Sequence, residues 1–254
     1  MFHWNPGRAG AALAAAALSI VAAFGAPDAR AQGWPALQTS PEAAQALAVF
    51  KRGPYGQMAK GRVAHATLVK GIYAIADPTG RYGPIFTDAR ATRMKNGGSA
   101  WLDVASGKPL ADAQVRSLRR DMAAGLDLSR AIAFRYGSGT ERAVLVSAYD
   151  CPYCRQLEQT LDGGSFDATV HLFPMSLQHN RPGSMAIARD IWCSADPATA
   201  WKAALLRGEA PVRAAPGCDK DARDAGMLLA LFDIKAVPAR IGPDGTVTQF
   251  QLRQ

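Results

Sequence analysis

Two cysteines separated by two residues are the clearest chemical signal in this sequence. Cys151 and Cys154 form a C-x-x-C motif, with Pro152 and Tyr153 between them. In such a pair one thiolate attacks a substrate disulfide, and the other thiol is close enough to attack the resulting mixed disulfide and release the substrate. The motif therefore predicts thiol-disulfide exchange, with Cys151 as the nucleophile and Cys154 as the resolving thiol.

Half of a zinc site is the alternative interpretation of the motif, and it would need two further ligands at suitable spacing. The nearest candidates are His171 and His179, and neither has the paired spacing of a zinc finger. His171 also lies inside a strand pattern, where an ordinary sheet histidine is expected. The sequence therefore predicts no metal and no other cofactor.

The residues on either side of the motif place it between a strand and a helix. Residues 143–148 have the pattern of a buried strand, and a helix is expected from Pro152 to Leu161. Unpaired N–H groups at a helix start stabilise negative charge, so the pKa of Cys151 is expected to lie below that of an ordinary thiol. Pro152 fixes φ in the first turn, and Tyr153 tunes the surroundings of the thiols.

The rest of the second half also shows strand and helix signals. One strand is expected well before the motif and another after it, then an Ala-rich helical region, and two strands close the chain. These elements are residues 131–136, 169–173, 183–232, 234–241 and 247–252.

The first half has the pattern of a small helix-plus-antiparallel-sheet domain that ends near Pro109. Ser40 and Gly53 are typical of the start and the end of a helix over residues 41–52. A mostly polar helix, residues 110–124, then connects this domain to the second half. Between the two helices, strand patterns separated by turn signals occur at residues 66–70, 71–76, 85–87 and 100–104.

The N-terminus has the order of signals found in a secretory signal peptide. An apolar run over residues 11–24 follows Arg8 and precedes an A-x-A site at residues 29–31. We therefore expect a cleavable signal peptide over residues 1–31; an uncleaved membrane anchor is the alternative. Outside the cytosol thiols tend to be oxidised, so the four cysteines are expected to include a disulfide.

Composition excludes several classes of protein. The chain has 254 residues, of which 48% are hydrophobic, so it can bury a core and is not intrinsically disordered. Its formal net charge is +8, but the basic residues are scattered and no RNA- or DNA-binding motif occurs. We therefore expect a solvated basic surface and no nucleic-acid partner.

A proline late in the chain connects the motif with a known fold. Val237 and Pro238 open one of the last predicted strands. A C-x-x-C between strand and helix, followed by such a proline, resembles the thioredoxin-like fold, in which the residue before a cis proline lies against the active-site disulfide. The resemblance implies that Val237 and a cis Pro238 shape the active site. An ordinary trans proline at an edge strand is the alternative.

Further segments narrow the resemblance to the DsbC/DsbG class of periplasmic disulfide isomerases. They are residues 71–75, 102–104, 107–110, 191–193 and 218–219. The resemblance implies an α+β fold: a signal peptide, a cystatin-like dimerisation domain, a linker helix, and a thioredoxin-like catalytic domain with a helical insertion. These parts correspond to residues 1–31, 32–109, 110–129 and 130–254, with the insertion at about 180–232.

The same resemblance implies a function and partners. A periplasmic homodimer would present an apolar cleft to misfolded or misoxidised exported proteins, and a membrane thiol reductase of the Dsb type would keep the catalytic pair reduced. The enzyme would isomerise or reduce non-native disulfides. The alternatives are a DsbG-like reductase of sulfenylated cysteines, and a dimeric chaperone or secretion-assembly module with incidental redox activity.

Two features depart from the class. The chain stops at Gln254, directly after its last predicted strand, where the family continues into a C-terminal helix, so one face of the sheet is expected to be less covered unless the helical insertion compensates. Val237 stands where Thr is common in the isomerase branch, and the Pro-Tyr dipeptide of the motif is more typical of the DsbG-like branch. Because of this second departure, the sequence does not decide between the isomerase branch and the DsbG-like branch.

Cys193 and Cys218 are too far apart in sequence to resemble the first pair. They flank a predicted helix over residues 197–207 and a proline-rich stretch over residues 211–216. We expect a structural disulfide that pins the helical insertion, worth roughly 3 to 4 kcal/mol on the chain-entropy model. The alternative is a second redox pair that relays electrons to Cys151.

Overall fold

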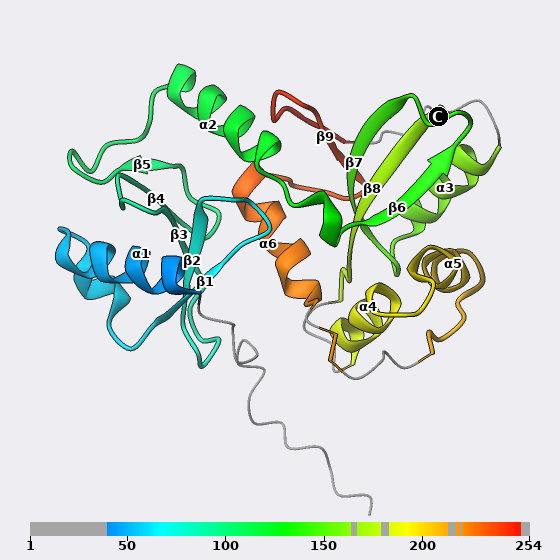
Figure 1. Ribbon diagram of the computed structural model, residues 1–254, viewed down its shortest axis with the longest axis horizontal. Helices are drawn as coiled ribbons and strands as arrows, with labels where there is room; N and C mark the ends of the chain where they lie inside the picture. The colour runs from blue at the N-terminus through cyan, green and yellow to red at the C-terminus, as the bar shows by residue number, and fades with distance from the viewer. Residues whose placement is uncertain (1–39, 164–166, 179–182, 213–216, 219, 250–254) are drawn as a thin grey trace, which may run out of the picture. The chain divides into compact units, whose positions relative to one another are not determined.

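The computed structural model describes residues 40–163, 167–178, 183–212, 217–218 and 220–249 (Figure 1). These residues form a mixed α+β fold with two five-stranded sheets, which confirms the predicted class. The predicted signal peptide, the end of the last predicted strand and His179 lie outside the described residues. No helix within the described part is long and apolar enough to cross a membrane.

The first sheet is antiparallel throughout and packs against α1 (Pro41–Arg52). Ser40 begins this helix as predicted, because its Oγ accepts a hydrogen bond from the Ala43 N–H at 3.1 Å, and Gly53 ends it. Phe50 is buried against the strands. After a short 3-10 turn, η1 (Gly56–Ala59), the sheet order is β1 (Val63–Ala66), β2 (Ile72–Ala76), β3 (Ile85–Asp88), β4 (Arg93–Asn96) and β5 (Leu102–Asp103).

The first strand lies earlier in the chain than predicted. The expected strand over residues 66–70 is wrong, because β1 ends at Ala66 and a turn follows. The Thr67 Oγ1 accepts a hydrogen bond from the Val69 N–H at 3.0 Å, and the Thr67 N–H donates to the Ile72 carbonyl at 3.2 Å. A threonine side chain that bonds to nearby backbone groups in this way favours a turn over a sheet ladder.

Strand β4 was not expected, because its side chains include two cations. Lys95 is fully buried in it, and its Nζ lies 2.7 Å from the Asp233 carboxylate, which also accepts from Arg119 at 2.7 Å. These two cations hold the pKa of Asp233 below its usual range, although burial alone would raise it. A carboxylate 138 residues away in sequence thus allows a buried cation in this strand.

Helix α2 (Asp112–Ala124) matches the predicted polar helix and ends at Gly125. Its narrow apolar stripe, Leu118 and Met122, is buried. On another side it touches the turn between the last two strands so closely that a Cβ at Gly245 would meet the backbone of α2. Gly245 also has φ of 77°, so both its conformation and its position require glycine.

The second sheet has the strand order β10-β9-β7-β8-β6. The central strands β7 and β8 are parallel, and β6, β9 and β10 each run antiparallel to their neighbour. Both central strands are largely buried, as expected of strands covered on two faces. The strands are β6 (Ile132–Tyr136), β7 (Glu141–Ala148), β8 (Ala168–Met175), β9 (Ala239–Ile241) and β10 (Val247–Gln249).

Helices connect these strands in the places that the sequence predicts. The helix α5 continues as one π-helical turn, η3, and stops at Gly208, whose φ of 69° suits glycine. Both α4 and α6 contact β8. The helical elements are η2 (Leu128–Arg130), α3 (Pro152–Asp162), α4 (Ser184–Trp192), α5 (Pro197–Lys202), η3 (Ala203–Arg207) and α6 (Ala222–Phe232).

The predicted strand over residues 234–241 is shorter than expected. Only β9, Ala239–Ile241, pairs within the sheet. Pro238 has no N–H to donate to a sheet ladder, so the strand begins after it. The segment before β9 is therefore irregular, and it carries the proline that the sequence singled out.

Candidate active site

Cys151 occupies the N-cap of α3, directly after the turn that ends β7. The Cys151 N–H donates to the Ala148 carbonyl at 3.2 Å, which closes that turn. The Cys151 Sγ accepts a hydrogen bond from the Cys154 N–H at 3.4 Å. The sulfur therefore takes the place that a serine or aspartate oxygen takes at most helix starts, where backbone N–H groups favour negative charge.

Both cysteines of the motif are free thiols, and both are buried. The Cys154 Sγ accepts a hydrogen bond from the Ala148 N–H at 3.4 Å. Burial raises the pKa of Cys154 well above its usual range, although the Ser147 hydroxyl and the Ala148 N–H act in the opposite direction. Cys154 is consequently held as a neutral thiol beside the sulfur at the helix start.

The peptide bond between Val237 and Pro238 is cis, and it lies against the motif. The thiol of Cys151 donates to the Val237 carbonyl oxygen, with 3.6 Å between the sulfur and the oxygen. Two segments 86 residues apart in sequence thus meet at one sulfur. The other two residues that the sequence singled out are Pro152 and Tyr153. Both lie in the exposed first turn of α3, and 56% of the Tyr153 surface is accessible.

Asp150 was not among the predicted site residues, although it directly precedes Cys151. Its carboxylate accepts hydrogen bonds from three donors after β8: the Ser176 hydroxyl at 2.7 Å, the Leu177 N–H at 2.8 Å and the Gln178 N–H at 3.2 Å. The donors lie 26 to 28 residues away in sequence. No local spacing could have indicated this cluster, because it depends on the parallel pairing of β7 with β8.

Glu158, a buried carboxylate in α3, links this helix to two other elements. Glu158 accepts hydrogen bonds from the Tyr136 hydroxyl of β6 at 2.6 Å and from the Trp201 indole of α5 at 3.3 Å. Burial, and then this hydrogen bond, raise the pKa of Tyr136. The helix that carries both reactive cysteines is therefore held to a strand on one side and to a second helix on the other.

Of the two candidate zinc ligands, His179 lies outside the described residues. His171 lies in β8 and pairs with Ala133 and Val144 on the neighbouring strands. Within the residues that the structure describes, no group of three or more His, Cys, Asp or Glu side chains could hold a metal ion. The geometry at Cys151 and Cys154 is that of two thiols beside a backbone carbonyl.

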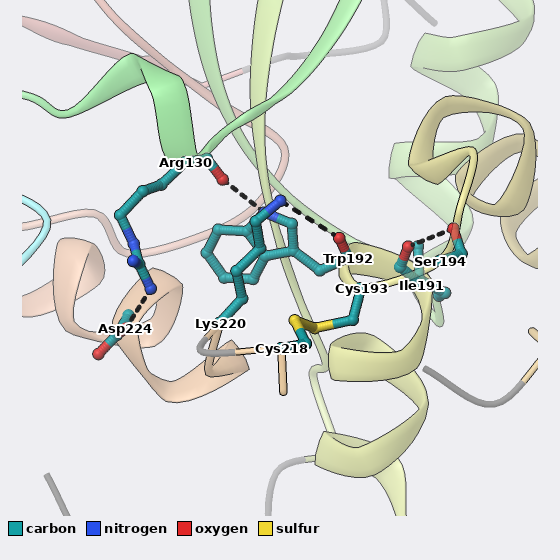
Figure 2. Close-up of a disulfide and its surroundings, with 8 residues drawn as sticks. All are labelled: Arg130, Ile191, Trp192, Cys193, Ser194, Cys218, Lys220 and Asp224. Carbon is teal, nitrogen blue, oxygen red and sulfur yellow. Dashed lines mark hydrogen bonds and ion pairs between the residues drawn. A yellow bond between two sulfur atoms is a disulfide. The ribbon is translucent and has the colours of Figure 1, made fainter. Parts of the chain in front are cut away.

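Cys193 and Cys218 form a disulfide, with 5.9 Å between their Cα atoms (Figure 2). Cys193 is the C-cap residue of α4, and Cys218 lies in the segment before α6. The bond therefore joins the end of one helix of the predicted insertion to the approach of another. It does not involve either thiol of the motif.

The residue before this disulfide connects it to the rest of the fold. The indole of Trp192 is fully buried and donates to the Arg130 carbonyl in η2 at 2.5 Å, and Lys220 donates to the Trp192 carbonyl at 3.4 Å (Figure 2). Arg130 forms an ion pair with Asp224 of α6 at 3.8 Å. The disulfide thus belongs to a set of contacts among α4, α6 and η2.

Comparison with known proteins finds relatives with a shared name. No family model matches the chain. A protein of Bordetella parapertussis named "Probable thiol:disulfide interchange protein DsbC" is 31% identical over 115 residues, which make up 45% of this chain and 39% of that protein. A Bordetella pertussis protein of the same name is 34% identical over 87 residues, 34% of this chain and 30% of that protein.

The chain is related to these DsbC proteins. This confirms the predicted relationship to thiol:disulfide interchange proteins. The matched regions span less than half the length of the DsbC relatives. A disulfide interchange protein from Neisseria gonorrhoeae of known structure is 28% identical, with a TM-score of 0.43 and coverage of 49% of this chain and 87% of that one.

Proposed function

We propose that the chain is a periplasmic thiol-disulfide exchange enzyme that isomerises or reduces non-native disulfides of exported proteins. The observation that carries the proposal is the position of the Cys151 sulfur. It accepts the Cys154 N–H at the start of α3 and faces the Val237 carbonyl, so a nucleophile, a resolving thiol and a backbone acceptor meet at one point. The DsbC relatives support the same chemistry through their names.

In the first step the Cys151 thiolate attacks one sulfur of a client disulfide. A bond forms between Cys151 and the client, the client S–S bond breaks, and the second client sulfur leaves as a thiolate. The start of α3 stabilises the charge on the attacking sulfur. Val237 and Pro238 orient the client backbone beside that sulfur, while Pro152 and Tyr153 shape the opposite side.

The second step decides between isomerisation and reduction. In isomerisation a thiolate of the client attacks the mixed disulfide, Cys151 leaves as a thiolate, and no electrons are transferred overall. In reduction Cys154 attacks Cys151, a Cys151–Cys154 disulfide forms, and the departing client thiolate takes up the proton that Cys154 loses. Two electrons then pass to the client, and a membrane thiol reductase restores the two thiols.

The raised pKa of Cys154 affects the balance between these routes. A thiol attacks only as its thiolate, so a resolving thiol that is held neutral attacks slowly. A slow resolving step gives a client time to exchange among its own cysteines before it is released. Both isomerisation and reduction therefore belong to the proposed function.

Variants of the two thiols test the proposal. Incubation with a protein whose disulfides have been scrambled is expected to give a covalent adduct with C154S on a non-reducing gel, and none with C151S. The wild-type protein is expected to restore native disulfides in that substrate. Failure of C154S to form an adduct, or equal activity in C151S, would contradict the proposal.

The assembly and location of the protein follow from the same proposal. The signal peptide over residues 1–31 directs the chain to the periplasm, and residues 32–109 form the dimerisation domain. Residues 110–129 connect it to the catalytic domain, residues 130–254. A monomer in light scattering at micromolar concentration would contradict the dimer, and a Cys151–Cys154 pair found fully oxidised in alkylation of intact cells would contradict the isomerase role.

A further inference from the structure

We propose that Asp150 is a positioning residue for Cys151. The positioning itself is independent of the proposed function, and only its use in disulfide exchange with clients rests on that function. Asp150 is the residue directly before the nucleophile. Its Oδ1 accepts from the Leu177 N–H at 2.8 Å, and its Oδ2 accepts from the Ser176 hydroxyl at 2.7 Å and the Gln178 N–H at 3.2 Å. Both carboxylate oxygens are thus engaged, which determines the orientation of the side chain.

The three donors follow directly after β8. Ser176 is fully buried, and its Oγ accepts from the Gln178 N–H at 3.0 Å, so its hydroxyl proton is directed to Asp150. One residue earlier, the Tyr149 N–H donates to the Met175 carbonyl at 3.2 Å. The carboxylate therefore extends the contact between the two central strands up to the residue that precedes Cys151.

This contact determines where the turn presents the nucleophile. Cys151 lies between the Asp150 anchor and the first turn of α3, and its sulfur lies 3.6 Å from the Val237 carbonyl oxygen. If Asp150 is released, the turn is free to rotate and to carry the sulfur away from the Cys154 N–H, the donor that favours its thiolate. A thiol reacts as its thiolate, so a sulfur that loses this donor is expected to react more slowly with an added electrophile.

Position and charge have opposite consequences here, which makes the inference testable. A carboxylate one residue from a thiolate repels it, so removing the negative charge by itself favours the thiolate and speeds its reactions. Removing the anchor by itself misplaces the sulfur and slows them. D150N abolishes the charge and one of the two acceptor oxygens while keeping the shape of the side chain, so the sign of its effect separates the two roles.

The experiment measures alkylation of Cys151 by iodoacetamide from pH 5 to pH 9 in a C154S background, so that Cys151 supplies the reactive thiol. D150N and D150A are expected to react more slowly than the parent, most clearly at acid and neutral pH, D150A by about tenfold. D244N is the matched control, because Asp244 accepts from the Thr246 N–H and hydroxyl at 3.1 and 2.7 Å in a turn away from the motif. It is expected to react like the parent.

Thermal unfolding of each variant separates misplacement from loss of fold. Unchanged unfolding midpoints with slower alkylation support the inference, and S176A, which removes one donor, is then expected to give a smaller loss of the same sign. Rates in D150N and D150A equal to or above the parent overturn it, and so does an equal loss in D244N. Alkylation involves no client, so a wild-type protein that fails to exchange disulfides refutes the proposed function and leaves this inference standing.

Discussion

One cysteine of each pair lies at the end of a helix, and the two ends are of opposite kind. Cys151 begins α3, where the N–H of Cys154 points at its sulfur, whereas Cys193 ends α4, and its own N–H donates back into the helix to Arg189. Helix starts favour negative charge and helix ends disfavour it. The cysteine at the helix start is a free thiol, and the cysteine at the helix end is bonded in a disulfide.

Sequence separation distinguishes the pairs as well. Cys151 and Cys154 lie within one turn of a helix, so their bonding or release closes almost no loop. Cys193 and Cys218 are 25 residues apart, and their bond restricts a long segment in the unfolded chain. The comparison teaches that one pair is placed to react and the other to constrain.

The largest expected effect is on activity. C151A is expected to lower the rate of disulfide exchange by more than about 1,000-fold, because no other thiol in the described structure sits at a helix start. The double variant C193A/C218A is expected to stay within about threefold of wild type where it is folded. Reduction of a scrambled protein substrate measures both, and an inactive but folded C193A/C218A would break the comparison.

The next largest effect is on stability, and it belongs to the other pair. C193A/C218A is expected to lower the free energy of unfolding by about 3 to 4 kcal/mol, because the unfolded chain regains the freedom of a 25-residue loop. Urea unfolding followed by circular dichroism measures this loss. C151A serves as the control, and a larger loss in C151A than in C193A/C218A would reverse the assignment of roles.

The third prediction is that the free energy of unfolding falls at alkaline pH because of a thiol in the reactive pair. Burial raises the pKa of Cys154 in the folded state, while an unfolded thiol ionises near pH 8.5. The stability that depends on the neutral thiol is complete below that pH and declines as the pH rises above it, by up to about 1.4 kcal/mol per unit.

Urea unfolding of the reduced protein at pH 8, 9 and 10 measures this decline. C154A is expected to lose less stability than wild type over the range, because it lacks the titrating thiol. The bonded pair has no thiol to titrate, so C193A/C218A is expected to show the same slope as wild type. Equal slopes in wild type and C154A would contradict the prediction.

The smallest expected effect is on stability, and it concerns a hydrogen bond beside the disulfide. W192F removes the indole N–H that donates to the Arg130 carbonyl and is expected to cost about 1 kcal/mol beyond the loss of ring volume. W101F is the matched control. Trp101 is equally buried, but its indole N–H has no hydrogen-bond partner among the described residues. An equal loss in both variants, measured by urea unfolding, would show that the hydrogen bond contributes nothing.

Local signals predicted most of the fold. Ser40 and Gly53 mark the ends of α1, Gly125 ends α2, and the apolar pattern before the C-x-x-C motif is strand β7. These features depend on residues within a few positions of one another, which a sequence displays directly. The approach of Val237 to Cys151 is a contact across 86 residues, and it was expected only through the resemblance to a known fold.

Two of the misses arise from partners that are remote in sequence. Strand β4 was overlooked because Lys95 is charged, and its burial makes sense only with Asp233 in place. Asp150 was overlooked because its donors follow the next strand of the sheet. In both cases the deciding interaction is electrostatic and long-range, and hydrophobic periodicity carries no information about it.

The ion pair between Lys95 and Asp233 also sets an order of events during synthesis. A chain leaving the ribosome presents Lys95 when its counter-ion is still 138 residues from being made. Burying an unpaired ammonium costs several kcal/mol, so this side chain must stay hydrated while the second half is translated. The burial of Lys95 in the first sheet can therefore be completed only after residue 233 has joined the fold.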